Sequence, residues 1–364
     1  MNRGMKRVLL GSTAIVGLGL LLPAEVFAAE PVSLSIGGYA RVEAWIVDQE
    51  DTSGFGARGY HMETDDAEVY WTATGEADNG LKYRADLQLD MDAGAVDEVW
   101  LRFQGAWGQL ELGDNDGVED VMEFEGTAAL SGQGGYDGGL GSVFDFNAVR
   151  VSGTGLVGNT SDATKISYFT PRINSVQAGV SFTPDTGHFL AAALSDGDAG
   201  DREDSIAFGI NSVNSFDDVN VNVSFTAVFA DPETGATHPD ESWAIGGNIS
   251  FGGFTLGASH NEMGDSGVAT PADGSDGGKY WEIAGGYSAG DYSIGIGYFR
   301  GEAGNATGTT DDETRIFTIG ANYNMAPGLR VYAEFDDIDI DQPGVGPGID
   351  NDGQLFMIGT NISF

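Results

Sequence analysis

Charged side chains of opposite sign occur in two neighbouring parts of this sequence, and they are the residues most able to do chemistry. Four basic residues lie on segments in which polar and apolar residues alternate: Arg41, Lys82, Arg84 and Arg102. Six acidic residues follow in a stretch without alternation: Asp114, Asp116, Glu119, Asp120, Glu123 and Glu125. Guanidinium groups stay charged and hold a fixed geometry, and grouped charges of one sign concentrate ions of the other. The chemistry that these sets predict is electrostatic selection.

Catalytic signals are weak. The chain contains no cysteine, which excludes disulfides, cysteine-ligated metals and thiol catalysis. The four histidines are far apart and lack the spacing of a metal site: His61, His188, His238 and His260. A hydrolase would need a serine, a histidine and an acid close together, and Ser259–His260 is an isolated pair. We therefore expect no enzyme.

Three acidic segments carry residue types that bind calcium, namely 114–117, 336–339 and 350–353. None keeps the calcium-loop pattern, because no glutamate falls at the closing position. The glycine-rich segment 134–139 occurs once and is interpreted as a loop. We expect no cofactor apart from calcium bridging external carboxylates, with Asp114 and Asp116 as the candidate ligands.

The charged residues are positioned by segments with a period of two, which is the signature of β-strands. In the segment 81–91, apolar residues alternate with Lys82, Arg84 and further polar residues without a miss, so its two faces contact different media. Almost nothing in the chain is typical of a helix. Sixteen segments are predicted as strands: 32–46, 68–74, 81–91, 96–104, 109–112, 164–171, 176–183, 204–213, 219–230, 241–251, 254–262, 279–288, 292–300, 313–325, 329–337 and 353–364.

The connections between these segments alternate between short and long, with residues 92–95 as the one brief exception among the long ones. Short turns at one end and long loops at the other are typical of an outer-membrane β-barrel, which also satisfies every backbone group in lipid. The segment 144–152 alternates weakly, but a seventeenth strand there would invert every later connection, so we assign it to the long insert. A soluble β-sandwich or jelly roll is the alternative, and its apolar faces would point inward.

The N-terminus predicts export. Arg3, Lys6 and Arg7 precede an apolar run, and the segment 26–28 supplies a cleavage site, so residues 1–28 are interpreted as a signal peptide. The remaining residues, 29–364, are predicted to form one barrel domain. They contain no run of about 18 apolar residues, so no transmembrane helix is expected.

The chain is strongly acidic, with a formal net charge of −40. Removing residues 1–28 takes away three basic residues and one acidic residue, which leaves −42. This charge excludes nucleic acid as a partner, because nucleic-acid binding requires neutralised phosphates. It also fits a salty habitat, where surface charge is screened.

The mature chain resembles the general porins of Gram-negative bacteria, in particular the alphaproteobacterial branch, over its whole length. The resemblance depends on three motifs and the terminal residue: 34–39, 165–172, 178–185 and Phe364. The last segment, which ends on Phe364, is similar to the outer-membrane assembly signal of that class. The expected fold is therefore all-β, a 16-stranded antiparallel transmembrane barrel.

The resemblance implies further properties. It implies a homotrimer whose third loop, residues 114–162, folds into the lumen as a constriction. The implied partners are outer-membrane lipid and lipopolysaccharide, the barrel-assembly machinery, and small hydrophilic solutes and ions. If the loop folds inward, the basic wall residues named above face its acidic residues across a narrow gap, which sets a transverse field and a size limit.

We expect an outer-membrane porin with a water-filled channel for passive diffusion of ions and small hydrophilic solutes. The net negative interior predicts a preference for cations. A substrate-selective channel and a secreted calcium-binding β protein are the alternatives. The sequence shows no aromatic slide or dedicated ligand cluster that would favour the former.

Overall fold

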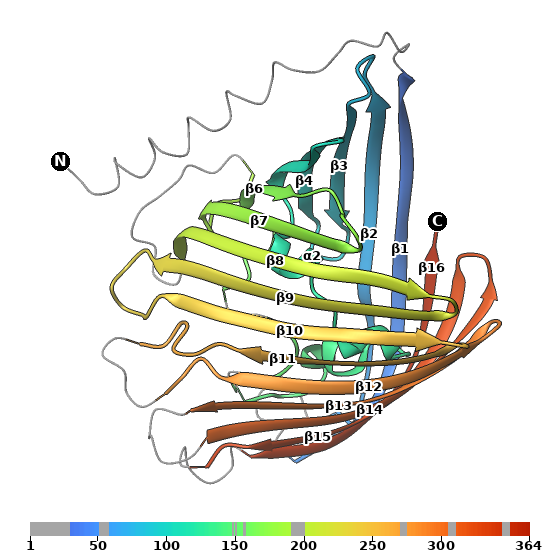
Figure 1. The fold of residues 1–364 in the computed structure, drawn as a ribbon. Coiled ribbons are helices and arrows are strands. Elements are labelled where there is room, and N and C mark those ends of the chain that lie inside the picture. The colour runs from blue at the N-terminus through green and yellow to red at the C-terminus, as the bar shows by residue number, and fades with distance from the viewer. Residues whose placement is uncertain are drawn as a thin grey trace.

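The structure is a computed structural model that describes residues 30–50, 58–147, 149, 151–155, 158–190, 201–269, 275–304, 311–343 and 350–364. The predicted signal peptide, residues 1–28, lies outside the described residues. Strands in the described part close into a single antiparallel barrel in which each strand pairs with its neighbours in sequence and β1 pairs with β16 (Figure 1). The fold prediction is confirmed.

Every predicted segment corresponds to one strand. The strands are β1 (Glu30–Gln49), β2 (Tyr60–Glu76), β3 (Lys82–Asp90), β4 (Ala95–Gly105), β5 (Gly108–Asp114), β6 (Thr164–Phe169), β7 (Val176–Asp185), β8 (Arg202–Phe216), β9 (Val219–Pro232), β10 (Asp240–Phe251), β11 (Phe254–Glu262), β12 (Lys279–Ala289), β13 (Tyr292–Gly304), β14 (Asp311–Ala326), β15 (Leu329–Asp341) and β16 (Asn351–Ser363). The predicted ends differ most for β2, which begins eight residues earlier than its alternation indicates.

The C-terminal residue meets β1 near the edge that carries the short turns. The backbone N–H of Phe364 donates to the carbonyl of Gly38 at 3.0 Å, and Gly38 returns the bond at 3.1 Å, which closes the barrel. One two-residue turn joins β10 to β11 through Gly252 and Gly253, with φ of 54° and 85°. Two consecutive positive φ angles are what a type I′ hairpin turn requires, and glycine adopts them without steric cost.

The two faces of each strand differ as the alternation predicts. In β12, Trp281 and Ile283 are 41% and 45% exposed on the outside, whereas Tyr280 and Glu282 are buried on the inside. An outward apolar band alternating with inward polar residues is the surface of a barrel that crosses a membrane. No helix within the described ranges is long and apolar enough to span a membrane.

The long insert between β5 and β6 lies inside the barrel (Figure 1). It forms α2 (Val118–Val121) and the short 3-10 turns η1 (Gly126–Ala129), η2 (Gly135–Asp137) and η3 (Leu140–Ser142). The helix α2 contacts β7 to β9, the turn η1 contacts β10 to β13, and the turn η2 contacts β13 to β15. The described residues of the segment 144–152 form no strand, so their assignment to the insert is confirmed.

Apolar packing and glycines let the insert approach the wall. Aromatic residues of the insert, Tyr136 and Phe144, join the buried cluster that contains Tyr280 and Phe299 of the wall. A Cβ on Gly320 of β14 would lie 1.8 Å from a carbonyl oxygen of the insert, so only glycine permits this contact. The insert is therefore packed as part of the core of the barrel.

Candidate functional site

Two buried carboxylates of the wall hold the backbone of the insert. Glu334 of β15 accepts hydrogen bonds at one oxygen, Oε2, from the N–H groups of Gln133, Gly134 and Gly135 at 2.9, 3.1 and 3.0 Å. Successive backbone N–H groups of this kind form a nest for an anion, which the carboxylate fills. Since Glu334 is only 1% exposed, these bonds lie inside the barrel and out of contact with solvent.

Glu282 of β12 makes the second attachment. Its Oε1 accepts hydrogen bonds from the N–H of Gly126 at 2.6 Å and from the hydroxyl of Ser259 at 2.7 Å. Its Oε2 accepts one from the hydroxyl of Tyr136 at 2.6 Å. The two carboxylates thus bond three parts of the insert to β12 and β15.

Hydroxyl groups of the opposite wall satisfy the start of the insert. The N–H of Val118 donates to Ser181 Oγ at 2.9 Å, and the N–H of Phe124 donates to Ser224 Oγ at 2.7 Å. Backbone groups that leave regular structure need such partners when buried. The small polar residues on the inner face of β7 and β9 therefore position the chain on either side of α2.

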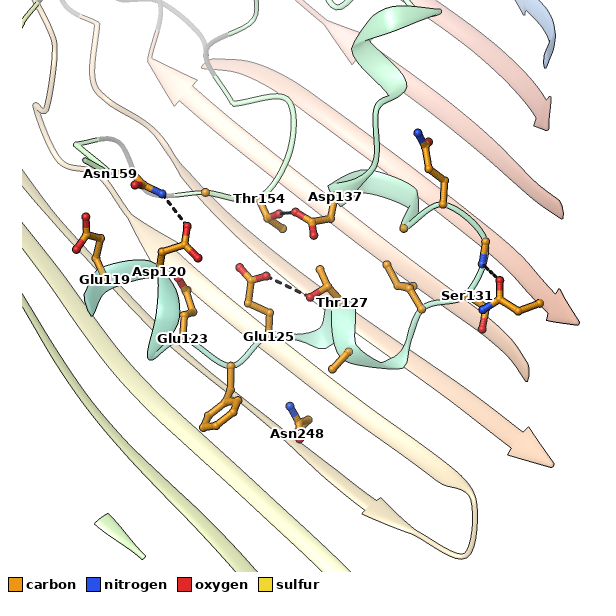
Figure 2. Close-up of a pocket in the computed structure, with 18 of the residues that line it drawn as sticks. Glu119, Asp120, Glu123, Glu125, Thr127, Ser131, Asp137, Thr154, Asn159 and Asn248 are labelled. Carbon is orange, nitrogen blue, oxygen red and sulfur yellow. Dashed lines mark hydrogen bonds between the residues drawn. The ribbon is translucent and has the colours of Figure 1, made fainter. Parts of the chain in front are cut away.

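An acidic cavity of about 740 Å³ lies along the insert. Figure 2 shows Glu119, Asp120, Glu123 and Glu125 in a row, with Asp137 across from them. Asn159 donates to Asp120 at 3.1 Å, Thr127 donates to Glu125 at 3.2 Å, and Thr154 donates to Asp137. Among the described residues that line this cavity, Arg330 is the one basic residue. The cavity is a region of strong negative charge.

Burial weakens the ionisation of these acids. Desolvation, followed by the nearby charges of Glu125 and Asp120, raises the pKa of Glu123 to about 9. Desolvation and the charges of Asp137 and Glu282 raise the pKa of Glu125 to about 8. Desolvation also raises the pKa of Asp137. Moving a carboxylate out of water disfavours its charged form, and like charges add to that effect.

Further cavities adjoin the acidic one. A cavity of about 360 Å³ shares Phe124 with it and is lined by Arg102 and Asp116 among others. Desolvation and the charges of neighbouring acids raise the pKa of Asp116 to about 7. A third cavity, of about 560 Å³, shares Arg102 with the cavity of about 360 Å³. A fourth, of about 750 Å³, lies at the short-turn edge and shares Arg330 with the acidic cavity. Each of these cavities therefore shares a lining residue with at least one other.

The predicted basic residues lie in two places. Arg84 and Arg102 both lie over the ring of Trp100, with their guanidinium carbons 5.5 and 4.8 Å from its centroid. Lys82 lines the same cavity as these two arginines. Arg41 is separate. Each arginine is paired with acids of the wall: Arg84 with Asp86, Arg102 with Glu111 at 2.7 Å, and Arg41 with Asp65 and Asp66 at 3.0 and 2.6 Å.

The predicted acidic residues also separate. Glu119, Asp120, Glu123 and Glu125 share the acidic cavity, whereas Asp116 lies in the neighbouring one with Arg102. Glu119 is fully buried and accepts bonds from Thr160 N and Oγ1 at 3.0 and 2.7 Å. Asp114, at the end of β5, is buried and accepts bonds from Thr164 and from the N–H of Leu190.

The structure adds residues that sequence reasoning missed. Arg330 and Asp137 line the acidic cavity, and Glu282 and Glu334 hold the insert. The two glutamates fall on the inward positions of their strands, a signal that the alternation carries. Nothing local indicates which inward acids meet the insert, because the partners are 146 to 201 residues away.

Two groups of three carboxylates could hold a cation: Glu43, Glu63 and Asp65, and Glu98, Asp116 and Asp162. The second contains one predicted calcium ligand, Asp116. The ammonium of Lys165 lies beside it and donates to the carbonyls of Asn115 and Ser161. Calcium at Asp114 and Asp116 stays a prediction.

The isolated pair noted in the sequence does not form a catalytic dyad. Ser259 points into the barrel and donates to Glu282 at 2.7 Å. His260 lies on the opposite face of β11, where its ring is 5.6 Å from that of Trp243. Successive residues of a strand point to opposite faces, so the two side chains diverge.

The chain is similar to known proteins in sequence and in fold. A family model described as Gram-negative porin matches residues 11–343. An uncharacterized protein of Rickettsia bellii is 22% identical over 330 residues, which cover 71% of this chain and 74% of the relative. An anion-selective porin from Comamonas acidovorans is 15% identical and has a TM-score of 0.64, covering 92% of this chain and all of its own. The in-vitro folded, trimeric OmpT of Vibrio cholerae is 14% identical with a TM-score of 0.61 and the same coverage.

Proposed function

The chain belongs to the Gram-negative porin family and forms an outer-membrane porin channel; from this premise we propose that it passes ions and small hydrophilic solutes by passive diffusion and prefers cations. The proposal depends above all on the acidic cavity beside the insert, in which five carboxylates lie with a single basic residue. An anion-selective porin shares the fold, so the fold does not decide the preference, and the charges must.

The acids of this cavity support cations even though burial raises the pKa of three of them, Glu123, Glu125 and Asp137. Glu119 is held as an acceptor by two hydrogen bonds, and Asp120 accepts one from Asn159. A unit charge about 4 Å from a passing ion contributes about 1 kcal/mol in water and more where the surroundings are less polar. Among the described residues, the carboxylates that line this cavity outnumber its basic residue, Arg330, five to one.

A second cavity differs in charge from the acidic one. Lys82, Arg84 and Arg102 line one cavity together with Glu76 as its acid. A solute that passes between this cavity and the acidic one crosses a field directed from the basic side of the wall toward the insert. Such a field orders dipolar solutes and favours small ones.

Assembly and export complete the proposal. The trimeric form of OmpT, a protein of the same fold, supports a homotrimer, although that title describes OmpT alone. Lipopolysaccharide and the barrel-assembly machinery, which would read the terminal Phe364, are the further partners that we propose. Residues 1–28 would direct export. The soluble calcium-binding protein weighed above does not fit a closed barrel with an apolar outer band.

A reversal potential measured in a planar bilayer under a KCl gradient tests the preference. We expect the sign that corresponds to K⁺ selectivity. The double variant Glu123→Gln and Glu125→Gln should be less cation-selective than the wild type at pH 9. An anion-selective reversal potential in the wild type would overturn the proposal.

A further inference from the structure

Three carboxylates of β1 and β2 meet on the inner wall, away from the acidic cavity. Each of Glu43, Glu63 and Asp65 offers an oxygen, and these oxygens lie within 4.8 Å of one another. Oxygens so spaced can share the shell of a hard cation, in which metal–oxygen distances are about 2.3–2.6 Å for calcium. We propose that these three residues bind a divalent cation, with Ca²⁺ as the ion that they fit.

A bulge in β2 builds the group. Glu43 pairs with Glu63 across the strands, and Arg41 pairs with Asp66, but the register shifts between these pairs and leaves Asp65 as an extra residue. A bulge of this kind re-aims a side chain, and bulges are common next to functional sites. Asp65 and Asp66 thereby both reach Arg41 on the inner side, although they are adjacent in sequence.

The burial of Glu43 is the independent observation that points to a ligand. Its side chain is 1% exposed, and Oε1 accepts a hydrogen bond from the hydroxyl of Tyr332 at 2.6 Å. Oε2 is buried as well and has no hydrogen-bond partner among the described residues. A buried carboxylate oxygen without a donor is unfavourable unless a cation compensates it.

The neighbouring basic groups leave this demand unmet. Arg41 bonds Asp65 and Asp66, and His61 lies 3.2 Å from Glu63, but no basic side chain in the described ranges forms an ion pair with Glu43. The donor set consists of carboxylate oxygens, which select calcium or magnesium over the softer metals. Calcium fits better because three side chains from a twisted wall and added waters suit its irregular shell, whereas magnesium demands a near-ideal octahedron.

The same carboxylates also bind the insert. Ser142 donates to Glu63 Oε1 at 2.9 Å, and Gln133 donates to Asp65 Oδ1 at 2.9 Å. The other oxygen of each carboxylate faces a basic group, Glu63 Oε2 the ring of His61 and Asp65 Oδ2 the guanidinium of Arg41. A cation that shares these oxygens with the basic groups would hold the two carboxylates in place. The site therefore joins β1, β2 and the insert, and removal of the ion should loosen this end of the insert.

Terbium luminescence of the detergent-purified full-length barrel tests the site. Trp45 is buried two residues from Glu43 on the same face of β1, so it should sensitise Tb³⁺ emission, and Ca²⁺ should displace the signal. We expect Glu43→Gln and Glu63→Gln each to weaken Tb³⁺ binding at least tenfold. The matched control is Glu302→Gln, which removes a carboxylate paired with Lys279 and Arg300 and outside both groups, and which should leave the Tb³⁺ affinity unchanged.

A second measurement covers variants that fold poorly. The temperature at which the folded band is lost should rise with Ca²⁺ and fall with EDTA in the wild type and in Glu302→Gln. It should respond to neither in Glu63→Gln, whose side chain is the most exposed of the three. Absence of Trp-sensitised emission in the wild type would overturn the proposal. So would a loss in Glu302→Gln or in Glu98→Gln equal to that in Glu63→Gln, because Glu98 belongs to the other carboxylate group and accepts a hydrogen bond from Trp100.

Discussion

Replacement of Glu334 by alanine should detach the middle of the insert from the wall. Three backbone N–H groups, of residues 133 to 135, now donate to one carboxylate oxygen, and the truncation leaves all three without that acceptor. Each buried donor left unsatisfied costs about 1–3 kcal/mol. Water that enters the gap will restore part of this, so we expect a net loss of about 3 kcal/mol in the attachment.

The magnitude is large enough to change the channel. About 3 kcal/mol corresponds to a shift of about 100-fold in the ratio of attached to detached insert. In single-channel recordings we expect larger current noise and additional conductance levels in Glu334→Ala. The conservative variant Glu334→Gln keeps an acceptor oxygen and should lie between it and the wild type.

A matched control is available in Glu302 of β13, a carboxylate paired with Lys279 and Arg300 and bonded to no described residue of the insert. Glu302→Ala should therefore conduct as quietly as the wild type. Equal noise in Glu302→Ala and Glu334→Ala, or none in either, would refute the reasoning that the nest holds the insert.

Three further predictions concern charge and packing. Because burial raises the pKa of Glu123 to about 9 and of Glu125 to about 8, both acids gain charge as pH rises from 7 to 10. Cation selectivity, measured by reversal potential, should therefore rise over that pH range. It should stay constant in the double variant Glu123→Gln and Glu125→Gln. The same raised pKa values mean that the free energy of unfolding should fall as pH rises from the unfolded-state pKa near 4.5 through 8–9, as denaturant titrations at several pH values would show. Gly320→Ala should destabilise the barrel by about 1–3 kcal/mol through overpacking and so lower the temperature at which the folded band is lost. Gly141→Ala should leave that temperature unchanged, because the space around Gly141 is open.

The number of strands could be predicted from the sequence because each strand separates two media, which makes its apolar and polar residues alternate. In β12, for example, the inward positions of Tyr280 and Glu282 alternate with the outward Trp281 and Ile283, and no helical pattern has this period. The failure at β2 has a local cause: the bulge at Asp65 breaks the period of two, so the residues before it do not read as strand.

The site was harder to predict from the sequence. The inward position of the insert came from a family resemblance, and the structure places it against β7 to β15. The acids that bind it could be recognised as inward-facing but not as its partners, because contacts between the insert and Glu334 span about 200 residues. Alternation reports which medium a side chain meets, and it carries no information about what packs against it from within.

Two kinds of acid inside the barrel explain how one acidic interior can both anchor and select. Glu282 and Glu334 receive hydrogen bonds from donors of the insert at short range, and their orientation is fixed by those donors. Glu123 lines the cavity, has one buried oxygen without a hydrogen-bond partner among the described residues, and is held partly neutral by burial. A change of pH between 7 and 10 should therefore alter the charge of the cavity while the anchoring bonds persist, so selectivity and insert position can vary separately. If current noise rose together with cation selectivity over that range, the two roles would not be separable in this way.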